Sequence, residues 1–187
     1  MQLQKLALLL TLATLLFGCT LQPTRNLSKP TVANTPPPNI SPALKSGLEE
    51  LRVIKIKIDT GINPKEYSED IIDLAHILKN AHGDDKVLLP VKSALEGHQL
   101  AIKFWQCDRV AGYDELYQCR DKILEAVFKK YPDIAAEAKA AVQGENLSYI
   151  SAGLDKDAVL QAIWQKTGTD TEAALQASYP VPLPKES

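Results

Sequence analysis

The chain has 187 residues, of which 45% are hydrophobic and 24% are charged. This composition is typical of a globular protein and excludes collagen-like chains, and three cysteines are too few for a disulfide-dense miniature scaffold. The length predicts one folded domain with additional segments. A formal net charge of −2 provides no basic surface field, so we expect no nucleic-acid partner.

The amino-terminal residues have the pattern of a secretory signal peptide. Lys5 precedes an uncharged, mostly apolar run over residues 6–17, and the small residue Gly18 follows it. In a helix this run extends about 18 Å, which is too short to cross the roughly 30 Å hydrocarbon core of a bilayer. We therefore predict a cleaved signal peptide over residues 1–18 rather than a membrane-spanning helix.

The sequence Leu16-Phe17-Gly18-Cys19 resembles the lipobox of bacterial lipoproteins. The resemblance implies that the Cys19 thiol forms a thioether to diacylglycerol and that the mature chain begins at this residue. It also implies that the acyl chains hold the protein in a membrane. Thr20 stands where an Asp would mark inner-membrane retention, so we expect a periplasm-facing anchor in the outer rather than the inner membrane.

Proline dominates the segment that follows. Residues 20–42 contain six of the twelve prolines, together with mainly Thr, Asn and Ser. Such a segment cannot bury enough apolar surface to offset the entropy of ordering it. We predict a disordered, partly polyproline tether over residues 19–42, with a reach of roughly 70 Å. A partner-binding role for these prolines is the alternative. A second Pro-rich disordered tail is predicted over residues 179–187.

Residues 43–178 carry apolar residues at helical spacing, which predicts one all-α domain. The pattern favours an up-down helical bundle of four to six helices with short connections. The β-branched run Val53–Ile58 leaves a strand as the alternative, although no second strand is available to pair with it. The predicted helices cover residues 43–59, 64 to about 82, about 84–110, 114 to about 131, 132–142 and 155–168, with a short final helix from Thr169.

Capping residues predict where several helices begin. Asn63 precedes Pro64, and Glu66 follows three residues after the cap, which is a strong helix start. Asp114 is predicted to cap the fourth helix, and the last long helix is predicted to begin at Asp155.

Glycine and proline predict where helices end or bend. Gly168 is predicted to end the last long helix, since Thr169–Glu172 has the form of a capping box for a further helix. Pro90 lies inside the third helix and predicts a kink or a delayed start there.

Two segments resemble parts of uncharacterised, all-helical bacterial secreted and lipid-anchored proteins. Residues Leu51–Leu78, with Gly61–Tyr67 at their centre, resemble a helical hairpin of those proteins. Residues Asp155–Leu175, with Trp164, resemble their final helix. The resemblance implies a helical secreted domain and carries no function with it.

The cysteine count fits an exported protein. Lipidation of Cys19 leaves Cys107 and Cys119 as a pair, and an oxidising compartment permits a disulfide. The two residues fall at about the same level in an antiparallel pair of predicted helices. We predict a structural disulfide between them. Free thiols, or redox or metal chemistry, are the alternatives, although the sequence has no CxxC motif.

Searches for catalytic motifs find no GxSxG, HExxH, phosphate-binding loop or dinucleotide fingerprint. His76 lies near the apolar stripe of the second helix and is predicted to be a packed core residue. His82 lies at a predicted helix end, and His98 beside Gly97 is predicted to mark a close helix contact. We therefore predict no catalytic residue, cofactor or metal site.

Three classes of function follow. The first is a lipid-anchored cell-envelope lipoprotein that acts as a non-enzymatic interaction or structural module, with the membrane as one partner and an envelope protein as a candidate partner. The second is a ligand-binding or inhibitor protein with a pocket between helices. The third is an enzyme, such as an uncharacterised hydrolase. The aromatic residues that would line the pocket are Phe104, Trp105, Tyr113, Tyr117 and Trp164.

Lipidation of Cys19 can be tested by one substitution. The Cys19→Ser variant should accumulate as an unlipidated precursor, because serine has no thiol to carry diacylglycerol. Membrane fractionation and the mass of the amino-terminal peptide measure this. A variant that matures and fractionates like the wild type would contradict the prediction.

Overall fold

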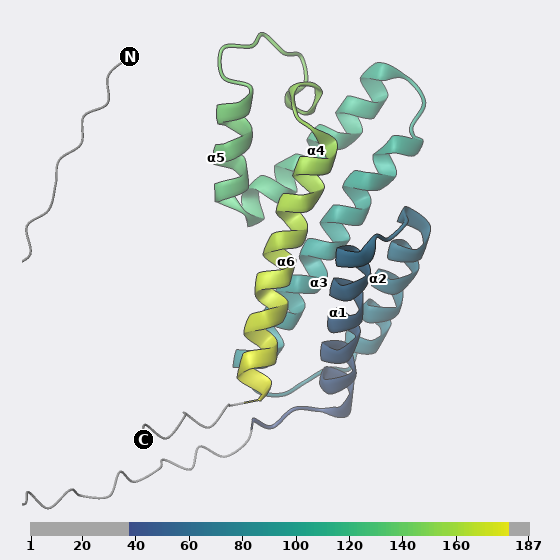
Figure 1. The fold of residues 1–187 in the computed structure, drawn as a ribbon, viewed down its shortest axis with the longest axis vertical. Coiled ribbons are helices and arrows are strands. Elements are labelled where there is room, and N and C mark those ends of the chain that lie inside the picture. Colours follow the sequence, from purple (N-terminus) through teal and green to yellow (C-terminus); the bar gives the residue numbers. More distant parts are fainter. Residues whose placement is uncertain (1–37, 180–187) are drawn as a thin grey trace, which may run out of the picture. The chain divides into compact units, whose positions relative to one another are not determined.

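The structure, a computed structural model, describes residues 38–179 and shows a bundle of α-helices (Figure 1). The all-α prediction is confirmed. The described elements are α1 (Pro42–Thr60), α2 (Pro64–Leu78), α3 (Asp85–Gln106), the 3₁₀ helix η1 (Cys107–Arg109), α4 (Tyr113–Lys130), α5 (Pro132–Ala141), the 3₁₀ helix η2 (Ile150–Gly153) and α6 (Lys156–Ser178).

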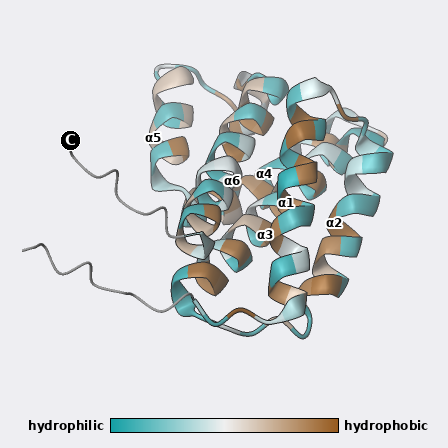
Figure 2. Ribbon diagram, turned by 60° about the horizontal axis from the view of Figure 1, so that its bottom comes forward, coloured by the Kyte–Doolittle hydropathy of each residue, from teal (hydrophilic) through white to brown (hydrophobic). Residues whose placement is uncertain are grey.

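Successive helices reverse direction, as an up-down bundle requires, and α3 lies at the centre (Figure 1). It contacts α1, α2, α4 and α6, and its interface with α6 is the most extensive in the bundle. Each helix carries both hydrophobic and hydrophilic residues (Figure 2), and the buried hydrophobic ones form one core cluster. None of the helices between residues 38 and 179 is both long and apolar enough to cross a membrane.

The alternating run Val53–Ile58 is helical, because it lies inside α1. The alternation of β-branched residues in this run does not show which of its residues face the core. Leu48, Leu51 and Ile54 are buried, whereas Val53 and Ile56 are 42% and 54% exposed. The core therefore takes the residues at helical spacing and leaves the β-branched neighbours in solvent.

The folded part begins earlier than residue 43. Ser41 caps α1, and its backbone N–H donates to the carbonyl of His82. The N–H of Asp84 donates to the carbonyl oxygen of Asn39. A Cβ atom at Gly83 would lie 2.6 Å from this Asn39 oxygen. Residues 39–42, assigned to the tether from their prolines, therefore belong to the fold. Residues 19–37 of the predicted tether lie outside the described residues.

The predicted start of α2 is confirmed. The side-chain oxygen of Asn63 accepts hydrogen bonds from the N–H groups of Lys65 and Glu66, at 3.1 and 2.9 Å. Lys57 on α1 forms ion pairs with Glu66 and with Asp70, at 3.2 and 2.9 Å. These contacts fix the hairpin of α1 and α2 at the end where the chain turns.

The predicted cap of α4 is wrong by two residues, whereas the predicted start of the third helix near residue 84 is confirmed. The N-cap of α4 is Gly112, and Asp114 lies within the first turn, where its charge favours the helix dipole. The third helix begins at Asp85 with Asp84 as its cap, so Pro90 does not delay it and lies inside the helix.

The predicted end of the last helix at Gly168 is also wrong, because α6 continues to Ser178. The hydroxyls of Thr169 and Thr171 donate to the carbonyls of Gln165 and Thr167, so both residues lie inside a helix and do not cap one. The local capping signal is overridden by packing, since α6 lies along α3 over its length.

Small residues bring α3 and α6 close together. A Cβ atom at Gly97 would collide with the Tyr131 hydroxyl and would lie 2.6 Å from Cγ2 of Thr167. Glycine is therefore required here by space, as the predicted close helix contact at this point implies. The other small residues buried on the two helices are Ala94 and Ala101 on α3, and Thr171, Ala174 and Ser178 on α6.

Cys107 in η1 and Cys119 in α4 lie at disulfide distance, with Cα atoms 5.7 Å apart. Next to them, the Arg120 guanidinium and the Lys156 ammonium pair with Asp108 at 2.7 and 3.0 Å. These ion pairs hold the pKa of the Asp108 carboxyl below its ordinary value, against the opposing effect of burial. The cysteine pair and these ion pairs thus connect η1, α4 and α6 at this end of the bundle.

The role of this cysteine pair in stability is a prediction. The double change Cys107→Ala and Cys119→Ala should lower the free energy of unfolding by roughly 3 kcal/mol, because the bond closes a short loop in the unfolded chain. Thermal melts with and without a reducing agent measure the effect, and the reducing agent should not change the melt of the double variant. Labelling of both thiols in unfolded, unreduced protein would contradict the prediction.

Candidate functional site

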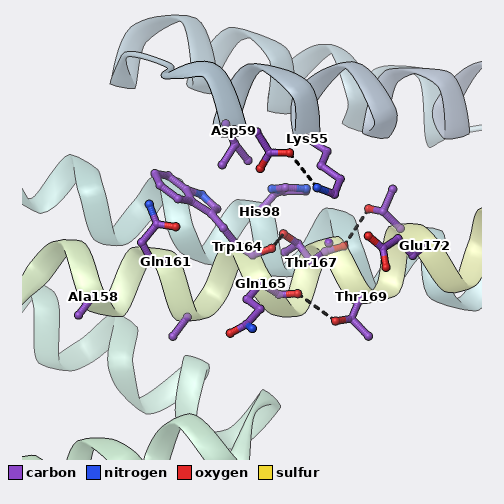
Figure 3. A pocket seen from close by; sticks show the side chains of 14 residues that line it. Lys55, Asp59, His98, Ala158, Gln161, Trp164, Gln165, Thr167, Thr169 and Glu172 are labelled. Atoms are coloured by element: carbon purple, nitrogen blue, oxygen red, sulfur yellow. Dashed lines mark hydrogen bonds and ion pairs between the residues drawn. The ribbon is translucent and has the colours of Figure 1, made fainter.

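A groove of about 740 Å³ runs between α1 and α6 (Figure 3). Lys55 and Asp59 line it from α1, and small residues of α6 leave space opposite them. The polar side chains that α6 contributes to the wall are Gln161, Gln165, Thr169 and Glu172. The groove is therefore walled by groups that donate and accept hydrogen bonds.

His98 of α3 forms part of the floor of this groove (Figure 3). Its side chain is almost completely buried, with 2% of its surface exposed. Thr167 of α6 is buried beside it, and Trp164 is half-buried at the same level. The imidazole ring of His98 therefore lies at the base of the groove, and the walls of the groove are open to solvent.

A hydrogen-bonded chain orients this histidine. Nε1 of Trp164 donates to the hydroxyl oxygen of Tyr67 at 3.0 Å. The same hydroxyl lies 2.7 Å from Nδ1 of His98 and 3.5 Å from its carbonyl oxygen. The hydroxyl therefore holds the imidazole through Nδ1, and the ring has the same orientation in either neutral tautomer. The chain joins α6, α2 and α3.

Burial keeps both titratable members of this chain neutral. Loss of solvent lowers the pKa of His98 to about 3. Burial also raises the pKa of the Tyr67 phenol well above its ordinary value, and the hydrogen bond from Trp164 only partly opposes this. At neutral pH the histidine is an uncharged hydrogen-bond donor, and the phenol retains its proton.

The Nε2 atom of His98 is the unused end of the chain. It takes part in no hydrogen bond with residues 38–179, whereas Nδ1 is engaged by Tyr67. A polar group of a ligand in the groove can therefore hydrogen-bond to Nε2, and the tautomer of the histidine decides which of the two atoms donates.

The charges around the groove nearly balance. The Lys55 ammonium donates to the Asp59 carboxylate at 2.8 Å, and this hydrogen bond is the main reason that the pKa of Lys55 is raised. The charge of Glu172 raises it further. One cation faces two carboxylates, so the lining has a small negative charge.

The structure brings only one of the five predicted pocket aromatics to this groove, which is Trp164. Trp105 packs against it at a ring-centroid distance of 5.6 Å, and Phe104 is buried in the core. Tyr113 and Tyr117 pack together at 4.6 Å and do not line the groove. The predicted aromatic set therefore divides between two separate clusters.

The prediction for His76 is wrong, because this residue is exposed on α2. The buried stripe of α2 contains Tyr67, Ile71, Leu74 and Leu78, and position 76 falls between its members on another face. The core histidine is His98. Its sequence signal was its place in the stripe of small apolar residues on α3, four residues after Ala94.

The other predictions about chemistry concern metals and the anchor. Within the part of the chain that the structure describes, no three His, Cys, Asp or Glu side chains are grouped so that they could hold a metal ion. Cys19 and the signal peptide lie outside that part.

Comparisons with protein-family models, curated proteins and solved structures find no match to this chain.

The buried histidine makes stability depend on pH. Burial lowers the pKa of His98 to about 3 in the folded state, and in the unfolded chain it returns to about 6.5. Between these values the unfolded chain binds one proton more, so the free energy of unfolding falls as the pH falls. The fall is at most about 1.4 kcal/mol per pH unit.

The His98→Gln variant cannot bind this proton, so its free energy of unfolding should depend less on pH between about pH 6 and about pH 4. Urea unfolding at several pH values measures both dependences. His76→Gln is the matched control, because His76 is exposed and its replacement should leave the wild-type dependence unchanged. An equal dependence in wild type and His98→Gln would contradict the prediction.

Proposed function

We propose that this chain is a lipid-anchored protein of the bacterial cell envelope whose helical bundle is a non-enzymatic binding module. The anchor is inferred from the lipobox-like sequence that ends at Cys19. The binding site is the groove between α1 and α6. The observation that carries the proposal is the buried His98, whose Nε2 has no protein partner at the groove floor.

The groove favours ligand binding over a purely structural role. Tyr67 holds the imidazole in one orientation, so the Nε2 atom is directed before a ligand arrives. A preorganised polar group loses little conformational entropy on binding, which favours affinity. The amide and carboxylate groups on the walls add further hydrogen-bonding positions.

The electrostatics of the floor favour binding over catalysis. A general base is effective when its pKa lies near the working pH, whereas the pKa of His98 is lowered to about 3. The hydroxyls of Thr167 and Thr171 donate to carbonyls of their own helix, at 2.9 and 2.8 Å. Neither hydroxyl is therefore placed as an activated nucleophile.

The cysteine pair supports the proposed location. Cys107 and Cys119 lie at disulfide distance, and disulfides persist in exported proteins rather than in the reducing cytoplasm. This observation concerns the compartment and is independent of the groove.

A photo-crosslinking residue placed at Gln165 in the full chain tests the binding module in the cells that produce it. The same residue at Ala173, which is exposed on α6 but does not line the groove, is the control. We expect a discrete adduct from position 165 that is absent from position 173. The absence of an adduct at 165, or equal adducts at both positions, would contradict the proposal.

A further inference from the structure

Gly168 has no structural reason to be glycine. It lies in the middle of α6, where glycine is less favourable than alanine, and its φ is not positive. A Cβ atom there would meet nothing nearer than Cε of Lys55, at 4.0 Å. Gly97 is the contrasting case, because packing excludes a side chain there. What the missing side chain of Gly168 provides is room in the groove, since this residue lines it.

The groove is elongated along α6. Its lining extends from Ala158 to Glu172, which at about 1.5 Å per residue corresponds to roughly 21 Å. Gln161, Gln165 and Thr169 follow one another along this length (Figure 3), at the spacing of one helix face. An extended chain fits this shape better than a single small ion does.

The polar groups of the lining specify the chemistry of that chain. The amides of Gln161 and Gln165 both donate and accept, the carboxylates of Asp59 and Glu172 accept, and Nε2 of His98 donates in one neutral tautomer and accepts in the other. A hydroxyl is the ligand group that pairs with all three kinds. The surplus of carboxylates disfavours an anion.

Two further features favour sugar rings over a peptide. The half-buried Trp164 offers an aromatic surface against which the apolar C–H face of a sugar can pack. An extended peptide is usually selected by pockets for alternate side chains, whereas the walls of this groove present mainly small and polar residues.

We infer that the groove between α1 and α6 binds a neutral oligosaccharide, with a ligand hydroxyl hydrogen-bonded to Nε2 of His98. Gly168 keeps the groove open for the chain of rings. This inference rests on the proposed function and adds the class of ligand to it.

Titration of the purified full-length protein with cellotriose, maltotriose and tri-N-acetylchitotriose tests the inference. Binding is followed by calorimetry and by tryptophan fluorescence, because Trp164 lines the groove. We expect saturable binding of at least one of these neutral trisaccharides. We expect at least tenfold weaker binding of the anionic trigalacturonate. Failure of all three neutral sugars to bind at millimolar concentration would overturn the inference.

The Gly168→Leu variant supplies the decisive comparison. The leucine side chain should fill the groove. Because leucine is more favourable than glycine inside a helix, the variant should melt at the same temperature as the wild type or higher. We expect at least tenfold weaker sugar binding in Gly168→Leu and unchanged binding in Ala173→Leu. His98→Gln should bind several-fold more weakly. Equal binding by Gly168→Leu and the wild type would overturn the inference.

The outcomes separate this inference from the proposed function. One outcome is that the peptide trialanine binds, that Gly168→Leu abolishes this binding, and that none of the sugars binds. The oligosaccharide assignment is then wrong and the proposed binding module stands. If no sugar binds and position 165 also yields no crosslink in cells, both are wrong.

Discussion

The hydroxyl of Tyr67 is the contact on which the arrangement of this bundle depends. The residue is fully buried, so its hydroxyl must find partners inside the protein. It accepts a hydrogen bond from Trp164, which is 97 residues away in sequence, and forms another with Nδ1 of His98, which is 31 residues away. These two bonds fix the rotation of α2, α3 and α6 about their axes, because a turn of any one helix would leave a buried polar group unpaired. Hydrophobic burial stabilises many helix arrangements, and this directional pair selects one of them.

The groove follows from the same arrangement. At Gly97 the α3 helix approaches α6 closely, so α6 is held against the centre of the bundle and not against α1. The contacts of α1 with α2 are more extensive than those with α6, which leaves the α1–α6 side open above the histidine. The Lys55–Asp59 pair lies on this side, where it has solvent on one face and the groove on the other. The floor is therefore fixed by buried hydrogen bonds, whereas exposed polar side chains form the walls.

Local signals in the sequence predicted the helices well, because they act within one or two turns. The cap at Asn63 and the apolar stripe that includes Leu51 and Ile54 are of this kind. The failure at Gly168 has a physical cause, since tertiary packing against α3 outweighs the local preference for a helix end. The Tyr67–His98–Trp164 chain was not predictable from spacing. An apolar stripe on a helix indicates that a polar residue within it is buried. It does not indicate which residue, distant in sequence, forms the hydrogen bond to that polar residue.

An unpaired buried polar atom does not by itself mark a binding site, and this protein contains the counterexample. The hydroxyl of Tyr131 is buried without a hydrogen-bond partner among the described residues. It is packed against Gly97 between helices and does not line the groove, so no ligand can reach it there. It is a cost of the close α3–α6 contact. His98 differs because its Nε2 atom lies at the floor of an open groove, within the same lining as a helix glycine that packing does not require. A polar atom held in one orientation and a glycine that leaves room beside it thus fall on a single groove. Packing of the bundle requires neither feature at that place, which is why their coincidence supports a ligand there.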